Sequence, residues 1–411
     1  MNKKLIIIAA ALLPFAACTK VTTGMEDTAE HEISFQVANY VQTKAPVAFA
    51  NADFGTYSWY TADDGSQQHV PFMVNEPVMF DEGNNMWTTS RRPYYWPKVG
   101  SLDFISYSPY CEASTTVVPD ASGEGAGTTT TSYNPTVTEN SIMWTDYRMD
   151  LSSPEDLMYS DKVTGQKENK STYTNISCVT GVQTLFHHAL AKLNFQVQAN
   201  FLKEGEGEDK TTWEVYLNQL RLDYIPNSGS LDLSLKEDNS SWNLPEVEGY
   251  HVWDYAKSTT DDLNLYQKSG TDAGLALTTE PQRVYTDENG EFVPLYVIPQ
   301  ILMSTDYESE DWTVGQQLVM DLTIVTHLPG NPDDSGKPLV ITENIHKVYD
   351  LKDISPLKAW EMNQDITYTI NIKPTASSDP GNPDDPKDVI ITFDPAVDDW
   401  VPVSSPIEIA L

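Results

Sequence analysis

The stretch Ile33-Ser34-Phe35-Gln36-Val37 alternates apolar and polar side chains without a break. Strict alternation is typical of a β-strand with one buried face, because successive side chains of a strand point to opposite sides. Short segments of the same kind recur along the chain, at 54–60, 102–107, 191–197, 213–222, 231–235, 295–298, 318–325, 341–348, 366–372 and 389–393. We therefore expect a protein built from many short strands.

Turn-forming residues separate these segments. The chain contains 26 prolines and 21 glycines, which are spread along it and would interrupt any long helix. Periodicity of the helical kind is nearly absent. Short strands with turn signals between them predict an all-β fold of the sandwich type, and 411 residues are enough for two such domains.

Three stretches of low complexity mark connections between strands. Residues 120–133 are rich in Gly, Ser and Thr, and residues 330–336 read as an acidic, hairpin-like turn. The Pro-rich segment 380–386 reads as a stiff linker before a C-terminal piece with two further extended runs.

The N-terminus has the features of a bacterial lipoprotein signal. Lys3 and Lys4 precede the apolar segment 5–13, and two alanines come directly before Cys18. That segment is too short to span a bilayer, which needs about 20 apolar residues. We predict cleavage before Cys18 and attachment of acyl chains such as palmitate to that cysteine, which would hold the protein on a membrane. An ordinary secretory signal followed by a chance cysteine is the alternative.

The charge of the chain argues against nucleic acid as a partner. The formal net charge is −35, and loss of Lys3 and Lys4 with the signal would make it −37. Binding to phosphates needs clustered Lys and Arg, and no basic patch stands out. Strong acidity suits proteins that repel one another at a surface. Hydropathy shows no second membrane segment.

Sequence motifs of catalysis are absent. The seven histidines form no His-Glu-x-x-His motif, and neither a Gly-x-Ser-x-Gly motif nor a phosphate loop occurs. We expect no enzyme, no cofactor and no metal site. His187 and His188 are expected to make structural contacts, and the acidic turn at Asp333 is expected to be solvated. Besides Cys18 the chain has Cys111 and Cys178, for which a disulfide and two separate thiols both stay open.

Aromatic residues are concentrated in Tyr94-Tyr95-Trp96-Pro97 and in the segment 102–109. Aromatic side chains of strands usually pack across the sheet, because each buries a large apolar area. We expect these rings to belong to the core. The alternative is an exposed platform that stacks on sugars, which would make the protein a surface glycan-binding lipoprotein.

Several motifs, taken in order, resemble the fimbrillins, specifically the Mfa-like group of type V fimbrial subunits from Gram-negative bacteria. They are Phe54-Gly55-Thr56-Tyr57, Trp87, Tyr94-Tyr95-Trp96-Pro97, Phe104-Ile105-Ser106-Tyr107-Ser108-Pro109, Asp156-Leu157-Met158-Tyr159, Phe186-His187-His188-Ala189-Leu190-Ala191-Lys192-Leu193, Tyr296-Val297-Ile298-Pro299-Gln300 and the segment 360–370. The resemblance runs from the lipid cysteine almost to the C-terminus.

The resemblance implies two tandem transthyretin-like β-sandwich domains. It also implies an outer-membrane lipoprotein precursor that becomes part of a surface fimbrium and serves cell adhesion, with other fimbrial subunits as partners. The expected divisions are a signal peptide at 1–17, a lipidated propeptide with the first strand at 18–44, sandwich domains at 45–180 and 181–379, and a linker with a C-terminal strand at 380–411.

The resemblance further implies a mechanism of assembly. In such pilins an Arg- or Lys-specific surface protease removes the N-terminal strand, and a strand of a neighbouring subunit fills the groove. Here the removed strand would be 33–41, with Ile33, Phe35 and Val37 facing inward, and the cut would separate Lys44 from Ala45. The family often has Arg at this point, so this chain would need a protease that accepts Lys.

The last five residues offer a candidate for the strand that is donated. Ile407, Ile409 and Leu411 alternate with Glu408 and Ala410, which is the pattern of a strand that needs a partner sheet. An exposed groove with unpaired backbone groups and apolar pockets two residues apart would accept such a segment. The alternative is that this tail completes its own C-terminal domain. The position in the fibre, at the tip, in the shaft or at the anchor, stays open.

Overall fold

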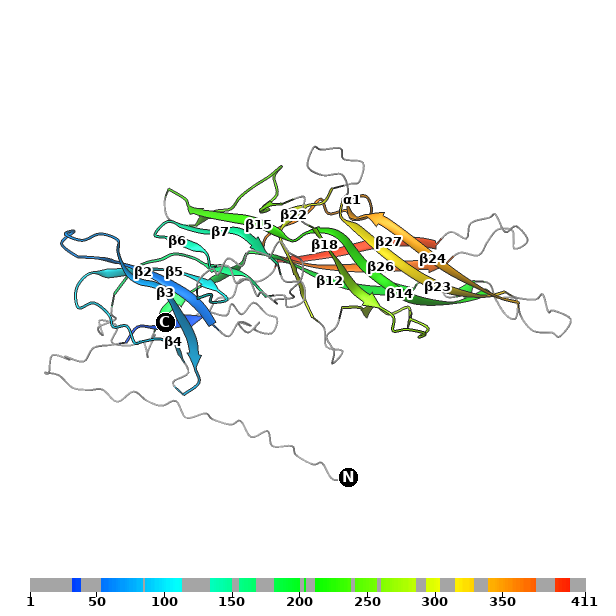
Figure 1. Cartoon of the computed structure of the whole chain (residues 1–411), viewed down its shortest axis with the longest axis horizontal. Coiled ribbons are helices and arrows are strands. Elements are labelled where there is room, and N and C mark those ends of the chain that lie inside the picture. Colours follow the sequence, from blue (N-terminus) through cyan, green and yellow to red (C-terminus); the bar gives the residue numbers. More distant parts are fainter. Residues whose placement is uncertain are drawn as a thin grey trace, which may run out of the picture.

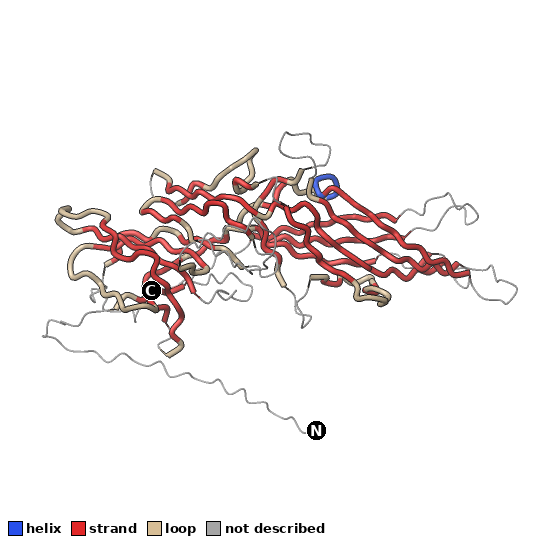
Figure 2. Tube along the Cα trace, in the orientation of Figure 1, coloured by secondary structure: helices blue, strands red, loops and turns tan. Residues whose placement is uncertain are grey.

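The structure is a computed structural model of the chain. It describes residues 32–37, 53–83, 86–112, 134–149, 155–167, 181–199, 203–204, 211–237, 241–256, 260–285, 293–303, 315–328, 339–374 and 389–399. In this part of the chain strands dominate, and the one helix is the short α1 (Leu351–Ile354) (Figure 2). No helix here has the length and apolar character needed to cross a membrane. The all-β fold expected from the sequence is confirmed.

The N-terminal strands form a nine-stranded sheet, called sheet 1 (Figure 1, blue to green). In spatial order it contains β10 (Val182–Thr184), β1 (Ser34–Val37), β4 (Met86–Thr89), β3 (Val70–Asp81), β2 (Asp53–Thr61), β5 (Ser101–Ser108), β8 (Met158–Ser160) and β11 (Phe186–His188), with β9 (Val163–Gln166) also paired to β5. The first and last strands of this order, β10 and β11, are separated in the chain by Leu185 alone. Sheet 1 therefore curls round until its two ends meet.

The curled sheet encloses an apolar cluster of its own, called the wrapped core. Its members come from strands all around the sheet and, for Ile33 and Tyr94, from residues next to them: Ile33, Phe35, Phe54, Met73, Val78, Tyr94, Leu102, Phe104, Met158, Val182 and Phe186. β2 and β5 are buried on both faces, because Phe54 and Phe104 point into the wrapped core while Tyr57 and Tyr107 point the other way. These two strands form the middle layer of the N-terminal region.

A smaller sheet covers the outer face of β2 and β5. This sheet 2 contains β16 (Trp242–Asn243), β15 (Ser228–Leu235), β7 (Ser141–Arg148) and β6 (Thr136–Thr138), with β17 (Asp254–Tyr255) also on β15. Trp144 of β7 packs edge-on against Tyr107 of β5, with ring centroids 6.4 Å apart. The N-terminal region is thus a sandwich of sheet 1 and sheet 2 around aromatic side chains.

The C-terminal region is a second sandwich. Sheet 3 contains β20 (Gln282–Arg283), β12 (Ala191–Ala199), β26 (Gln364–Pro374) and β27 (Val389–Asp399), with β21 (Leu295–Val297) on β12. Sheet 4 contains β13 (Lys203–Glu204), β14 (Thr211–Pro226), β23 (Gln317–Leu328) and β24 (Leu339–Asp350), with β18 (Thr260–Gln267) and β19 (Leu275–Ala276) on β14. β22 (Gln300–Ile301) and β25 (Ala359–Trp360) pair with each other in a two-stranded sheet that shares no strand with sheet 3 or sheet 4.

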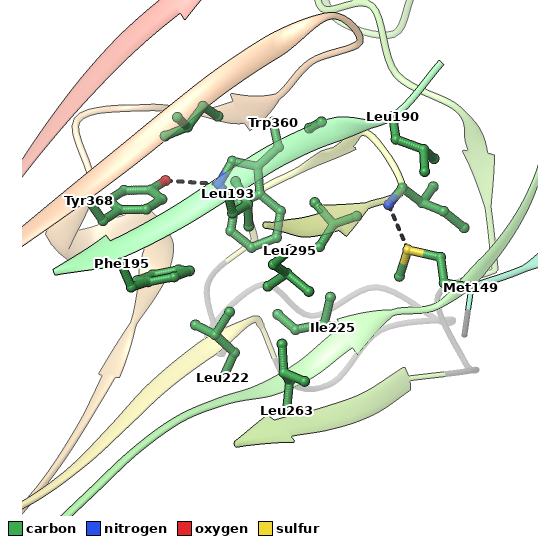
Figure 3. Close-up of a cluster of buried hydrophobic side chains, with 14 of the residues drawn as sticks. Met149, Leu190, Leu193, Phe195, Leu222, Ile225, Leu263, Leu295, Trp360 and Tyr368 are labelled. Carbon is green, nitrogen blue, oxygen red and sulfur yellow. Dashed lines mark hydrogen bonds between the residues drawn. The ribbon is translucent and has the colours of Figure 1, made fainter. Parts of the chain in front are cut away.

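Leucines, isoleucines and aromatic residues fill the space between sheet 3 and sheet 4 (Figure 3). Phe195 of β12 stacks on Tyr368 of β26, with ring centroids 5.3 Å apart. The indole N–H of Trp360 donates a hydrogen bond of 2.8 Å to the hydroxyl of Tyr368, so both polar atoms are satisfied within the core. This cluster continues without interruption to Tyr107 and Trp144, and the two sandwiches therefore share one main core.

Strand pairing crosses the division that we expected after residue 180. β11 pairs with β8, and β15 pairs with β7, so sheet 1 and sheet 2 draw strands from both sides of that position. Sheet neighbours are chosen by non-local packing, and a change of composition along the chain does not reveal this. The C-terminal piece is likewise integrated, because β27 pairs with β26 from Gln364↔Asp399 to Pro374↔Val389. Residues 400–411 lie outside the described residues.

Candidate functional site

The first strand, β1, lies between two neighbours of sheet 1. It pairs parallel with β10, in the register Phe35↔Val182, and antiparallel with β4, in the register Phe35↔Trp87. Just before the strand, the backbone N–H of Ile33 donates a hydrogen bond of 2.7 Å to the carbonyl oxygen of Tyr94. β1 therefore supplies backbone partners on both sides, and its loss would leave two strand edges open.

The inward side chains of β1, together with that of Ile33 just before it, fill the middle of the wrapped core. Ile33 and Phe35 are at most 1% exposed, and Val37 is half-buried against the same cluster. The ring of Phe35 lies edge-on to those of Phe54 and Phe104, at centroid distances of 5.6 and 5.7 Å. Full burial contributes about 1.5–3 kcal/mol for each large apolar side chain. Removal of β1 would thus open a groove with two deep apolar pockets, two residues apart.

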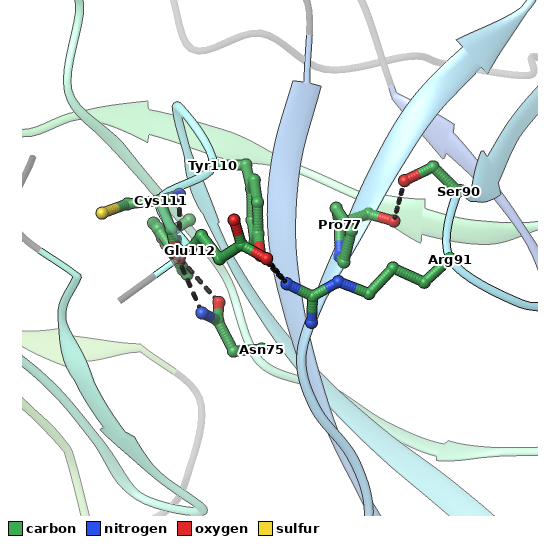
Figure 4. Close-up of polar contacts among 8 residues, drawn as sticks. Asn75, Pro77, Ser90, Arg91, Tyr110, Cys111 and Glu112 are labelled. Carbon is green, nitrogen blue, oxygen red and sulfur yellow. Dashed lines mark hydrogen bonds and ion pairs between the residues drawn. The ribbon is translucent and has the colours of Figure 1, made fainter. Parts of the chain in front are cut away.

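The chain from Thr89 to Trp96 closes one end of this groove. Ser90 is held on β3, because its backbone N–H donates to the carbonyl oxygen of Pro77 at 2.9 Å. Arg91 turns away from the groove, and its guanidinium donates to Glu112 at 2.8 Å (Figure 4). Arg92 takes the other side and stacks on the ring of Tyr94, with its guanidinium carbon 4.5 Å from the ring centroid.

Tyr94 links this end to the sheet. Its hydroxyl donates to Glu76 Oε1 at 2.8 Å and accepts a hydrogen bond from Arg92. Partial burial raises the pKa of Tyr94 above its ordinary value, more than the hydrogen bond from Arg92 lowers it. The phenol therefore stays protonated at neutral pH and can act as a donor to the carboxylate.

The expected core position of the aromatic residues holds for most of them. Tyr94 is buried and Trp96 is half-buried, but the Tyr95 side chain is 40% exposed. Every tryptophan among the described residues is buried or half-buried. Two other aromatic side chains in this part of the chain are exposed to a similar degree, Phe80 at 43% and Tyr224 at 39%, and they come from separate strands.

The two adjacent histidines make structural contacts, as expected. His187 stacks on Tyr159 and lies 3.0 Å from Asp161, measured from Nε2 to Oδ1. The Nδ1 atom of His188, which is buried, lies 2.9 Å from a carboxylate oxygen of Asp156. Within the described residues, no three His, Cys, Asp or Glu side chains are placed to hold a metal ion.

Several residues singled out in the sequence lie outside the described residues. These are Cys18, Lys44, Ala45, Cys178, Asp333, Ile407, Ile409 and Leu411. Cys111 is buried, and the choice between a disulfide with Cys178 and two separate thiols stays open. The structure therefore brings together Ile33, Phe35 and Val37 but does not place the expected cleavage point or the candidate donor strand.

Sequence patterns did not reveal the strands on either side of β1. β4 and β10 contain only four and three residues, which is too short for a periodic signal. The sequence signal that could have indicated the closed end of the groove is the pair Arg91-Arg92, which comes shortly before the aromatic motif.

Comparison with known proteins gives matches that span most of the chain. A family model described as fimbrillin-like matches residues 43–400. Similar solved structures include a fimbrial protein from Bacteroides vulgatus, 16% identical, which covers 90% of this chain and 99% of its own with a TM-score of 0.49. Another is the fimbrial anchor protein Mfa2 from Porphyromonas gingivalis, 9% identical, with coverage of 92% and 100% and a TM-score of 0.27. No curated protein matches the chain.

The family model spans every strand of the described residues except β1, since its match begins before β2 and ends after β27. The resemblance inferred from the motifs is thus confirmed. The chain belongs to the fimbrillin-like family.

Proposed function

We propose that the chain is a structural subunit of surface fimbriae that is exported as a lipoprotein and assembled by protease-triggered strand exchange. Membership of the fimbrillin-like family supports the fimbrial role and a place at the cell surface among other fimbrial subunits. The finer steps are acylation of Cys18, cleavage between Lys44 and Ala45, and filling of the groove by a neighbour's strand. No catalysis and no cofactor are involved.

The observation that carries the proposal is the connection of β1 to the rest of the fold. β1 ends at Val37, and β2 begins at Asp53, so Lys44 belongs to the one covalent link between them. A single cut in this link would free β1 and leave every other strand on one continuous chain. The vacated groove would expose the pockets of Ile33 and Phe35 together with the edges of β4 and β10. A strand from another subunit with apolar side chains at every second position would fill these pockets and pair with these edges.

The experiment is digestion of the full chain with a Lys-specific protease. We expect loss of the residues before Ala45, followed by polymers that resist mild heating in detergent. Lys44→Gln should block both events. Lys20→Gln is the matched control, because a cut at Lys20 would leave β1 attached, and this variant should behave as the wild type. A wild-type chain that is cut after Lys44 and stays monomeric would contradict the proposal.

Deletion of residues 405–411 tests the origin of the donated strand. If the tail is donated, the shortened chain should fold and be cut at Lys44 but should form no polymers. Polymers of the shortened chain would instead assign the tail to its own C-terminal domain. Incorporation of labelled palmitate into the wild type but not into Cys18→Ser tests the lipid separately.

The glycan-binding alternative has less support. It requires at least two exposed aromatic rings on one surface, and in the described part of the chain most of the large rings are buried. The exposed Tyr95 has its neighbours Tyr94 and Trp96 turned into the protein.

A further inference from the structure

Strand β24 forms one edge of sheet 4, next to β23 (Figure 1). With 12 residues it is the longest edge strand in the described part of the chain, and its register to β23 runs without a shift from Gln317↔Asp350 to Leu328↔Leu339. No described strand pairs with its other side. An unbroken edge of this length can accept a further strand.

The opposite edge of sheet 4 is irregular. There β18 pairs with β14, and the register shifts between Leu220 and Arg221 and again between Leu222 and Ile225. Such irregularities are one way in which proteins keep an edge from pairing with another chain. The register between β24 and β23 has none, so any restriction on the pairing of β24 comes from its side chains.

The side chains of β24 alternate between two faces of the sheet. The exposed set is Val340, Thr342, Asn344, His346 and Val348, and the half-buried set is Ile341, Glu343, Ile345, Lys347 and Tyr349. The half-buried set lies on the core side, because Ile345 at its centre is opposite the buried Leu322 of β23. Charges on the core side of an edge strand discourage pairing with an ordinary apolar strand.

These charges nevertheless match those of a second β24. Glu343 and Lys347 flank Ile345 symmetrically, two residues before it and two residues after it. If two β24 strands run antiparallel with Ile345 opposite Ile345, each Glu343 faces a Lys347 of the other copy. Each Ile341 then faces a Tyr349. Opposite charges and pairs of aromatic with β-branched side chains both stabilise antiparallel neighbours.

Other antiparallel registers lose this match. A slide of two residues in either direction places both charged side chains opposite isoleucine or tyrosine, and a slide of four places Glu343 opposite Glu343 or Lys347 opposite Lys347. Slides of one or three residues bring the core side of one copy onto the exposed side of the other. The side chains therefore select the register centred on Ile345.

We propose that the open edge of β24 pairs with β24 of a second copy of this chain, antiparallel about Ile345, so that sheet 4 continues from one copy into the other. This contact is isologous, with the same strand on both sides. It lies in the C-terminal sandwich and needs neither cleavage at Lys44 nor a donated strand, so it goes beyond the proposed function.

The dimer should be weak. One strand edge is a small contact beside the ~1,600 Å² of a standard interface, and the formal charge of −35 on each copy opposes association. On a fimbria, where the subunit would repeat along the fibre, many such contacts between neighbouring fibres would add up. That consequence rests on the proposed function, whereas the dimer itself does not.

The test measures the dimer of the uncut chain by sedimentation velocity at about 0.1 mM. Glu343→Lys and Lys347→Glu should each weaken the dimer about tenfold, because each variant places like charges opposite each other twice. An equimolar mixture of the two variants should dimerise like the wild type, because every introduced charge then faces its opposite. Glu237→Lys, at an exposed position after β15 in sheet 2, is the matched control and should leave the dimer unchanged.

The register is read by disulfide crosslinking in a chain that also carries Cys18→Ser and Cys178→Ser. Ile345→Cys should crosslink to the same position of the second copy. Ile341→Cys, on the same face, should not, because the two copies of that position would be about 27 Å apart.

A wild type that stays monomeric, or a mixture that dimerises no better than its two components, would overturn the inference. If either charge reversal prevents folding, as judged by circular dichroism, the crosslinks decide, and a crosslink from Ile341→Cys without one from Ile345→Cys overturns it as well. Polymers of the wild type after cleavage at Lys44 are a separate readout, so failure of the β24 contact is distinguishable from failure of strand exchange.

Discussion

The wrapped core and the C-terminal sandwich bury similar side chains but hold their strands in different ways. In the wrapped core, β1 has four residues and is bound by short registers to β4 and β10. In the C-terminal sandwich, β26 has 11 residues and pairs along its length with β12 and β27. β1 is also the first strand of the described chain, so the polypeptide links it to another strand at its C-terminal end alone. β26 is preceded and followed along the polypeptide by other strands.

This contrast shows that deep burial of a side chain and firm hydrogen bonding of its strand are separate properties. Phe35 is as deeply buried as Tyr368, yet few backbone hydrogen bonds fix the strand that carries it. Free energies of local opening depend on such contacts and vary within one protein. We therefore expect the C-terminal sandwich to open only with global unfolding and β1 to leave by itself once its link to β2 is cut.

The largest expected effect is that of Trp360→Ala. The indole is fully buried and donates to Tyr368, so the variant leaves both a cavity and a hydroxyl without its donor. Loss of a buried Trp costs about 3–5 kcal/mol. Thermal melting followed by circular dichroism should show one transition at a clearly lower temperature, because sheet 3 and sheet 4 share this core.

Val340→Ala is the control for that substitution. Val340 is on β24 of the same sandwich, but 48% of its side chain is exposed, and its loss should hardly change the melting temperature. Equal effects of the two variants would show that burial does not decide stability in this region.

Phe35→Ala should have a smaller effect that depends on the state of the chain. In the uncut precursor it removes the ring between Phe54 and Phe104, at a cost of about 3 kcal/mol, and should speed hydrogen exchange in β4 and β10. After cleavage at Lys44 residue 35 is no longer part of the subunit. Polymers from the variant and the wild type should therefore melt alike.

Val37→Ala sharpens this test, because Val37 is only half-buried. It should accelerate exchange in the precursor in the same strands but by less. If Phe35→Ala instead lowered the stability of the C-terminal sandwich by the same amount, β1 would not be an independent element, and its release by a single cut would lose its physical basis.

The sequence predicted the elements of the C-terminal sandwich better than those around β1. β12 alternates between buried and partly exposed side chains along its whole length, which is the pattern that alternation predicts. β3 was not predicted, because Pro71 and Pro77 lie within it and Asn75 has a positive φ of 48°. Prolines in a strand usually indicate an edge or an irregularity, and β3 indeed changes register against β2.

Of the candidate site, the sequence predicted the inward residues of the first strand but not the strands beside it. Alternation indicated Ile33 and Phe35 as inward residues, because that information is local. The choice of β4 and β10 as neighbours and the position of Arg92 beside Tyr94 depend on how sheet 1 curls. No pattern within β1 contains that information.

The smallest expected effects come from exposed carboxylates, one in each region. A hydrogen bond from Lys167 and another from the backbone N–H of Gly100 lower the pKa of Asp63, in the turn between β2 and β3 of sheet 1. A hydrogen bond from the Tyr216 hydroxyl, and with it His327, lowers the pKa of Glu214 in sheet 4. A lowered carboxyl pKa contributes stability above the ordinary pKa of about 4 and loses it as the pH falls through the lowered value.

Asp63→Asn and Glu214→Gln should therefore differ from the wild type at pH 6 and converge with it near pH 2. Hydrogen exchange would locate the change: in β2 and β3 for Asp63→Asn, and in β14 and β23 for Glu214→Gln. Solvent screens both groups, so each change should be small and should shrink further in high salt. Because the C-terminal ladders open together, the effect of Glu214→Gln should spread over sheet 4, whereas that of Asp63→Asn should stay local. A local effect at both sites would remove the contrast in cooperativity between the two regions.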